Sequence, residues 1–173
     1  MNVAHLKGIS NLGVVKNPEY AEPWLRAIGS YMLNFGSIEL LSYKYLDYLE
    51  STEEEFLVNT NKLLGARISR IEALIKLTNL QQKEEVLEVW SVVRKLSKWR
   101  NRIAHNPVLP TWKPGSDREN STPDVLGVSD MKQISKENKT TDSISLKGLG
   151  MLNDETVKIA EKLNELCESI KQP

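Results

Sequence analysis

Apolar positions recur every three or four residues over most of the chain, which predicts helices rather than strands. The longest such stripe predicts a helix from about Pro23 to Glu50, because proline suits the first turn of a helix. Ser51 and Glu54 have the spacing of a capping box, which predicts a short helix after Ser51. Three further stripes predict helices over Asn61–Leu77, Gln82–His105 and Asp154–Ile170.

Two stretches lack this periodicity. Residues 1–19 are interrupted by glycine and proline, and we expect an irregular arm there. Residues 107–150 are rich in proline and small polar residues, and within them 125–128 and 143–146 can pair as a small hairpin. Asn153 then fits as the cap of the helix in the C-terminal segment 151–173. The prediction is one all-α domain over residues 1–173, a bundle of about five helices with a loop-rich insertion before the last.

Composition narrows the classes of function. Lys and Arg total 23 and Asp and Glu total 23, so no global basic charge points to nucleic acid or membrane. One cysteine and two histidines leave no internal disulfide and no convincing metal site, and no motif predicts a cofactor. No apolar run reaches the roughly 20 residues of a membrane helix, and the N-terminus lacks a signal-peptide core. We therefore expect a cytoplasmic protein.

Charge is nevertheless uneven along the chain. Residues 91–106 contain no acid but five basic residues, namely Arg94, Lys95, Lys98, Arg100 and Arg102. Basic side chains near a helix C-terminus complement the helix dipole, which accounts for part of this run. The remainder forms a local cationic end on a neutral protein, and such an end is suited to phosphate groups.

Arg100 stands out because it falls inside the apolar stripe of its helix, between Val93 and Leu96 on a helical wheel. An arginine there must extend to solvent, pair with a carboxylate or face another subunit. Glu39 borders the stripe of the first helix and is the candidate partner. His105 follows Arg100 by five residues, roughly 140° around an ideal helix. The two side chains converge only if the helix frays before Pro107 or if two chains combine.

At these residues the chain resembles the HEPN superfamily of helical bundles. Its Arg-x(4–6)-His motif near the end of a long helix is matched by Arg100 and His105, and Asn101 matches the polar residue that often follows the arginine. The segment from Phe35 to Glu39 is also similar to the preceding family helix. The resemblance covers about residues 20–106 and the last helix.

The resemblance implies a metal-independent endoribonuclease whose active site forms at a homodimer interface, which we expect to involve the helix that carries Arg100. Many family members are toxins of toxin–antitoxin or antiviral defence systems, which implies an antitoxin or regulatory protein as a further partner. Other members are non-catalytic modules that bind a protein or a nucleic acid, and this alternative stays open. Pro107 stands where one branch has a regulatory tyrosine, so that mode of control is not expected.

The residue types fit this chemistry. An imidazole such as that of His105 can take and return a proton near neutral pH. Arg100 can clamp a phosphate, and Asn101 can orient the histidine or bond a phosphate oxygen. Three basic residues are expected to hold the flanking RNA backbone, namely Lys95, Lys98 and Arg102. Trp99 either packs or stacks on a base, and His5 receives no role.

Overall fold

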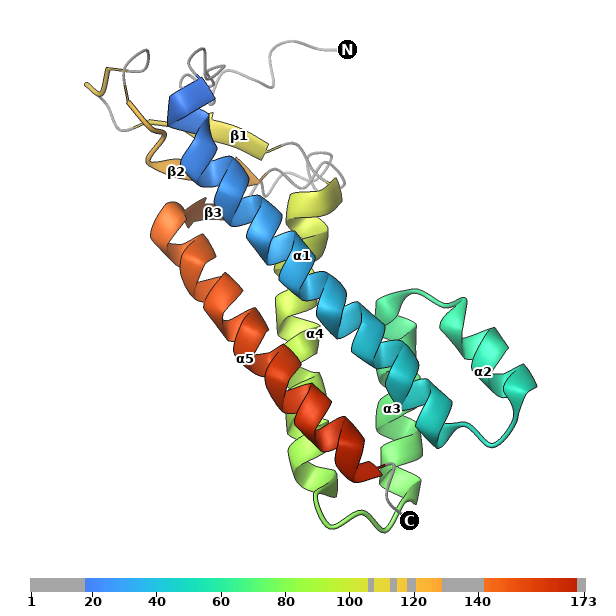
Figure 1. The fold of residues 1–173 in the computed structure, drawn as a ribbon. Coiled ribbons are helices and arrows are strands. Elements are labelled where there is room, and N and C mark those ends of the chain that lie inside the picture. Colours follow the sequence, from blue (N-terminus) through green and yellow to red (C-terminus); the bar gives the residue numbers. More distant parts are fainter. Residues whose placement is uncertain (1–17, 106–107, 113–114, 118–120, 129–141, 171–173) are drawn as a thin grey trace, which may run out of the picture. The chain divides into compact units, whose positions relative to one another are not determined.

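The protein is predominantly helical in a computed structural model, which describes residues 18–105, 108–112, 115–117, 121–128 and 142–170. The five helices are α1 (Pro18–Leu49), α2 (Glu53–Thr60), α3 (Leu64–Leu77), α4 (Lys83–His105) and α5 (Leu146–Ile170) (Figure 1). The strands are β1 (Val108–Thr111), β2 (Val125–Val128) and β3 (Asp142–Ser145). The predicted helical bundle is confirmed. His5, Pro107 and most of the predicted arm lie outside the described residues.

The chain divides into two compact units, which we describe separately. The sheet unit comprises Met1–Gly29 and Asn101–Met151, and the bundle unit comprises Ser30–Arg100 and Leu152–Pro173. The chain passes from one unit to the other three times, each time inside a helix, so α1, α4 and α5 each contribute to both units.

The core of the bundle unit is aromatic and aliphatic. Tyr45 and Trp90 pack edge to face with ring centroids 5.2 Å apart. The Tyr45 hydroxyl donates to the Leu163 carbonyl at 3.0 Å, and the Tyr31 hydroxyl donates to the Leu96 carbonyl at 2.9 Å. These bonds satisfy polar groups that would otherwise be costly to bury. Within this unit α4 runs antiparallel to α1 and α5 (Figure 1).

The sheet unit is built on an antiparallel sheet with the strand order β1-β2-β3. The predicted pairing of 125–128 with the segment around Ile144 is present, with Leu126 opposite Ile144. Strand β1 was not predicted, because Pro110 within it is typical of loops and of sheet edges. Two indole N–H groups anchor the loops, since Trp24 donates to the Pro123 carbonyl at 3.0 Å and Trp112 to that of Ser121 at 3.1 Å.

The predicted starts of the first and last helices, α1 and α5, were wrong. α1 begins at Pro18, five residues before Pro23, because proline and the acidic Glu19 also suit the first turn of a helix. α5 begins at Leu146, because the Ser145 hydroxyl accepts the Gly148 N–H at 3.0 Å and caps the helix there. A Cβ on Gly148 would lie 3.3 Å from the Ile144 and Ser145 side chains, so glycine suits this turn despite its low helix propensity.

Two smaller boundaries also differ from prediction. Thr52, not Ser51, caps α2, and its hydroxyl oxygen accepts the Glu55 N–H at 3.2 Å. Both residues precede a glutamate by three positions, and the extended backbone of Thr52 selects between them. α3 begins at Leu64 rather than Asn61, because Asn61 ends α2 and donates to the Leu57 carbonyl. No helix among the described residues is long and apolar enough to cross a membrane.

Candidate functional site

Arg100 is held against α1 by an ion pair and an aromatic ring. Its Nη2 lies 2.9 Å from Oε1 of Glu39, so the pair expected from the helical wheel is present in the structure. The guanidinium carbon lies 6.0 Å from the centroid of the buried Phe35 ring, a cation–π distance. The Arg100 side chain is 25% exposed and that of Glu39 is 28% exposed, so solvent and ions reach both groups.

The Glu39 pair explains why an arginine lies in the apolar stripe of α4. Of the three alternatives open at the level of sequence, the carboxylate pair within one chain is realised. The position of Arg100 therefore does not require another subunit to cover it. About a quarter of each side chain is exposed, so the Glu39 carboxylate keeps part of its hydration if a competing anion such as phosphate binds Arg100.

Tyr31 fixes the turn of α4 that precedes Arg100. Its hydroxyl donates to the carbonyl of Leu96, four residues before Arg100. Burial raises the pKa of Tyr31 well above its usual range, so the hydroxyl remains a donor at all physiological pH values. The sequence analysis did not single out Tyr31, although it lies one turn before Phe35 on the same face of α1.

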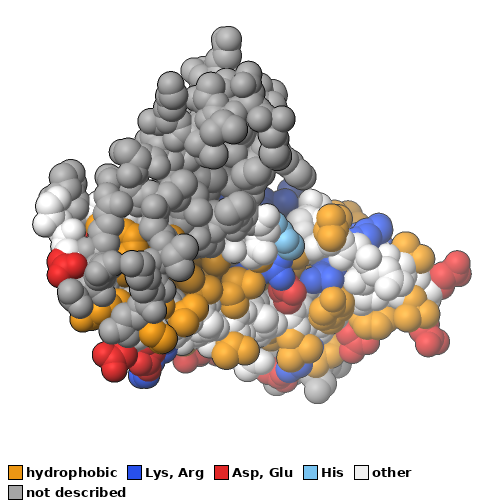
Figure 2. All heavy atoms as spheres, turned by 90° about the horizontal axis from the view of Figure 1, so that it is seen from above, with side chains coloured by type: hydrophobic (Ala, Val, Ile, Leu, Met, Phe, Trp, Pro, Cys, Tyr) orange, Lys and Arg blue, Asp and Glu red, His pale blue; other side chains and the backbone are white. Residues whose placement is uncertain are grey.

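The other basic residues of the bundle unit differ in their surroundings. Arg94 is committed to α3, because its Nη2 lies 2.7 Å from Oε2 of Glu72 and 3.2 Å from the Ser69 hydroxyl. Lys95 and Lys98 are exposed and form no ion pair with any described residue. Of the basic residues at 94, 95, 98 and 100 on α4, these two therefore have the least to lose on binding a phosphate. Figure 2 shows basic, acidic and hydrophobic side chains interspersed on the face that it presents.

Three of the remaining predicted residues belong to the sheet unit. His105 is the last residue of α4 and is exposed, Asn101 is exposed, and Arg102 is half-buried. Ile103 is buried and fixes the rotation of this last turn. Trp99, in the bundle unit, is half-buried, which fits packing as well as a partly available ring.

Arg100 and His105 lie in one uninterrupted helix, because α4 does not fray before its last residue. Five residues of α-helix turn their side chains roughly 140° apart. On such a helix the two side chains do not point toward one another, so fraying before Pro107 and the combination of two chains both stay open as ways to bring them together.

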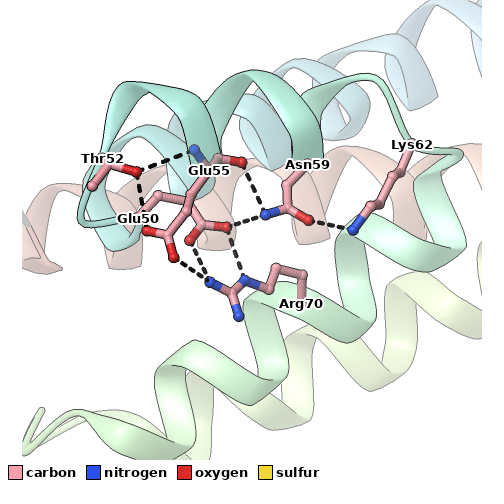
Figure 3. A network of polar contacts seen from close by, with 6 residues as sticks. All are labelled: Glu50, Thr52, Glu55, Asn59, Lys62 and Arg70. Atoms are coloured by element: carbon pink, nitrogen blue, oxygen red, sulfur yellow. Dashed lines mark hydrogen bonds and ion pairs between the residues drawn. The ribbon is translucent and has the colours of Figure 1, made fainter.

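A second Arg–Glu pair, which sequence reasoning missed, joins α3 to Glu50, the residue that follows α1, and its carboxylate is more deeply buried than that of Glu39. The Glu50 side chain is 1% exposed and accepts from Arg70 Nε at 2.9 Å and Nη2 at 2.6 Å (Figure 3). Asn59 donates a further bond to Glu50 at 2.7 Å. The hydrogen bonding of the Arg70 guanidinium to Glu50 raises the pKa of Arg70. No short spacing links these residues, so only the tertiary structure identifies them.

Arg67 is the most buried arginine of the unit, and its role is structural. Its Nη1 donates to the Tyr43 hydroxyl at 2.7 Å and to the Thr60 and Lys62 carbonyls at 3.3 and 3.1 Å. The guanidinium carbon also lies 4.2 Å from the centroid of the Tyr43 ring. Arg67 therefore caps the carbonyl end of α2, where a cation is favoured by the helix dipole.

Metal ligands do not gather in the described part of the chain, where no three His, Cys, Asp or Glu side chains form a group. Comparisons of the chain with models of known families, with curated proteins and with solved structures gave no match. The resemblance to the HEPN superfamily therefore rests on the motif residues and on the helices that carry them.

Proposed function

We propose that this chain is a metal-independent endoribonuclease of the toxin or antiviral defence type, acting in the cytoplasm as a homodimer. The observation that carries the proposal is the setting of Arg100. It lies on the apolar side of α4, positioned by Glu39, Phe35 and Tyr31, yet a quarter of its side chain remains exposed. The exposed His105 ends the same helix, as the Arg-x4-His motif requires.

The proposed reaction uses the 2′-hydroxyl of RNA as the nucleophile. His105 takes the 2′-OH proton while the 2′-oxygen attacks the adjacent phosphorus. The bond from phosphorus to the 5′-oxygen then breaks, and the partner subunit's His105 gives its proton to that oxygen. Arg100 leaves Glu39 to bind the phosphate oxygens, which carry the additional charge of the transition state. The products are a 2′,3′-cyclic phosphate and a 5′-hydroxyl.

Asn101, Lys95, Lys98 and Arg102 support this reaction. Asn101 orients a histidine or bonds a phosphate oxygen, and the three cations bind the flanking backbone. Control in the cell would then fall to an antitoxin or another regulatory protein.

A defined RNA oligonucleotide incubated with the purified protein in excess EDTA tests the proposal. Mass spectrometry should find products with 2′,3′-cyclic phosphate and 5′-hydroxyl ends, and a 2′-deoxy substitution at the cut site should block cleavage there. His105→Ala and Arg100→Ala should both be inactive, whereas Arg94→Ala, which also breaks an Arg–Glu pair of α4, should stay active. Products with a 5′-phosphate, or a magnesium requirement, would contradict the proposed mechanism.

The neutralised charge of Arg100 favours a second candidate, a non-catalytic module that binds a partner protein or RNA. An arginine already paired with Glu39 can serve the fold alone. In this case expression of the wild type, His105→Ala and Arg100→Ala proteins would leave cell growth equally unaffected, with soluble protein each time. Growth arrest by the wild type alone would favour the nuclease.

A further inference from the structure

Helix α2 is amphipathic in the reverse of the usual sense. Its buried residue is the polar Asn59, whereas Leu57 and Val58 are 52% and 54% exposed. Phe56 is the remaining large apolar residue of α2 and is half-buried. An ordinary surface helix buries its apolar side and exposes its polar side. The outer side of α2 therefore has the composition of a surface that binds another molecule.

Polar contacts hold α2 in this orientation. The Asn59 amide donates to Glu50 at 2.7 Å and to the Glu55 carbonyl at 2.9 Å, and its oxygen accepts from Lys62 at 2.7 Å (Figure 3). Arg67 bonds carbonyl groups at the end of the same helix. Rotation of α2 to bury its outer side would break these bonds and leave buried polar groups unsatisfied, which is costly. The apolar side chains are thus held in solvent by the fold itself.

The outer residues of α2 form one stripe along the helix. Glu54, Leu57, Val58 and Asn61 are all exposed and follow one another at the spacing i, i+3, i+4 and i+7. Leu63, at the turn into α3, is 87% exposed. Side chains at this spacing are those with which one helix packs against another. The stripe therefore suits a partner that is itself helical.

Charge beside the stripe selects the class of partner. Glu53 and Glu54 are exposed and form no ion pair within the described part of the chain. Acidic residues in a first turn stabilise the helix dipole, but they also surround the stripe with negative charge that repels RNA phosphates and anionic lipids. A second copy bound through the same face would bring like charges together. A basic segment of a different protein has the complementary charge.

We propose that α2 is the docking site for a helix of another protein, a helix that is apolar along one side and flanked by lysine or arginine. Leu57 and Val58 pack against its apolar side chains, and its basic side chains pair with Glu53 and Glu54. This surface uses none of the residues proposed for RNA cleavage. It therefore stands whether or not the chain cleaves RNA.

Synthetic peptides probe the surface, with binding to the full chain followed by fluorescence anisotropy. A peptide of leucine and lysine, roughly 18 residues long with leucine at helical spacing, should bind with a micromolar Kd. Leu57→Glu and Val58→Glu should each raise this Kd at least about tenfold. Leu77→Glu is the matched control and should leave it unchanged, because Leu77 is 83% exposed at the other end of α3. No binding by the wild type, or equal losses in all three variants, would overturn the proposal.

Charge variants test the complementarity while leaving the apolar residues in place. The double variant Glu53→Gln, Glu54→Gln should bind the lysine peptide more weakly and with a smaller dependence on salt. The same peptide with glutamate in place of lysine should not bind the wild type. Equal binding of the two peptides would contradict the assigned charge of the partner. Circular dichroism confirms that each variant is folded.

Photo-cross-linking in the source cells tests the proposal with the natural partner. A photoreactive amino acid in place of Val58 should cross-link to a different protein, and mass spectrometry should map the link to a segment with Lys or Arg beside apolar residues at helical spacing. The same amino acid in place of Leu77 is the control. A yield no higher than at Leu77, or a link to a second copy of this chain or to an acidic segment, would overturn the proposal.

Discussion

Two Arg–Glu pairs of the bundle unit join helices in the same way but differ in the burial of the carboxylate. Glu50 is almost fully buried and is bonded by Arg70 and Asn59, whereas Glu39, which holds Arg100, remains partly open to solvent. A buried carboxylate that loses its cation stays buried and unpaired, which is costly. A hydrated one regains water. The comparison indicates that Arg70 stays bound to Glu50 as long as the protein is folded, while Arg100 can exchange Glu39 for another anion.

The largest expected effect is on stability. Arg70→Ala should lower the free energy of unfolding by about 3 kcal/mol or more, because it leaves Glu50 buried without its cation. Arg100→Ala should cost about 1 kcal/mol, because Glu39 stays partly hydrated. Urea unfolding followed by circular dichroism measures both. Equal losses would remove the basis for treating the two pairs differently.

For the rate of RNA cleavage the order should be reversed, so that substitution of Arg100 has a large effect and substitution of Arg70 has a small one. Arg100→Lys should lower the rate about 10²-fold, because an ammonium cannot reproduce the planar fork of a guanidinium on a phosphate. Arg70→Lys should cleave at close to the wild-type rate wherever circular dichroism shows it folded. A large rate loss in folded Arg70→Lys would mean that the buried pair also acts on the site.

Two tyrosines extend the comparison to pH. Burial raises the pKa of both Tyr31 and Tyr45, so each contributes stability that is present below the ordinary tyrosine pKa of about 10. Above that pH the unfolded chain ionises while the native hydroxyls stay protonated. The free energy of unfolding should then fall by about 1.4 kcal/mol per pH unit for each tyrosine.

Replacing each tyrosine by phenylalanine shows how much of the loss of stability at alkaline pH that tyrosine causes. Tyr31→Phe and Tyr45→Phe should each remove one tyrosine's share of the alkaline slope in urea unfolding series. Only Tyr31→Phe should also lower cleavage, because Tyr31 bonds the carbonyl four residues before Arg100. Tyr45 bonds the Leu163 carbonyl on α5 instead. An unchanged alkaline slope in both variants would show that other groups carry the pH dependence.

The sequence predicted the helices well where a long apolar stripe repeats, as in α4, and it placed Glu39 beside Arg100 from the helical wheel alone. It failed where local signals compete. Ser51 and Thr52 offer the same capping spacing, and the glycines before Asn153 concealed the start of α5. Asn153, predicted as a cap, instead accepts from Asn34 at 2.8 Å inside the bundle.

The buried pair of Glu50 and Arg70 lay beyond prediction for a different reason. The two residues are 20 positions apart, and their meeting depends on how α2 turns the chain back between α1 and α3. Burial of a carboxylate is a property of the packed structure and leaves no periodic trace in the sequence. Arg100 and His105, by contrast, were singled out because only five positions separate them in the sequence.

The smallest expected effect is on the salt dependence of RNA binding by the remaining basic residues of α4. It also tests whether Arg94 behaves like Arg70 or like Arg100. In an inactive His105→Ala background, affinity for single-stranded RNA should fall as salt rises. Lys95→Ala and Lys98→Ala should each reduce the slope of log K against log salt by about 0.7, the share of one phosphate contact. Arg94→Ala should change it less, because Arg94 is already bound to Glu72 at 2.7 Å and to Ser69. Fluorescence anisotropy at four or more salt concentrations gives the slopes. If Arg94→Ala lowers the slope as much as the lysine changes do, an ion pair to a half-buried glutamate does not withhold an arginine from RNA. The distinction between committed and exchangeable arginines would then apply only to the pair at Glu50, where the carboxylate is almost fully buried.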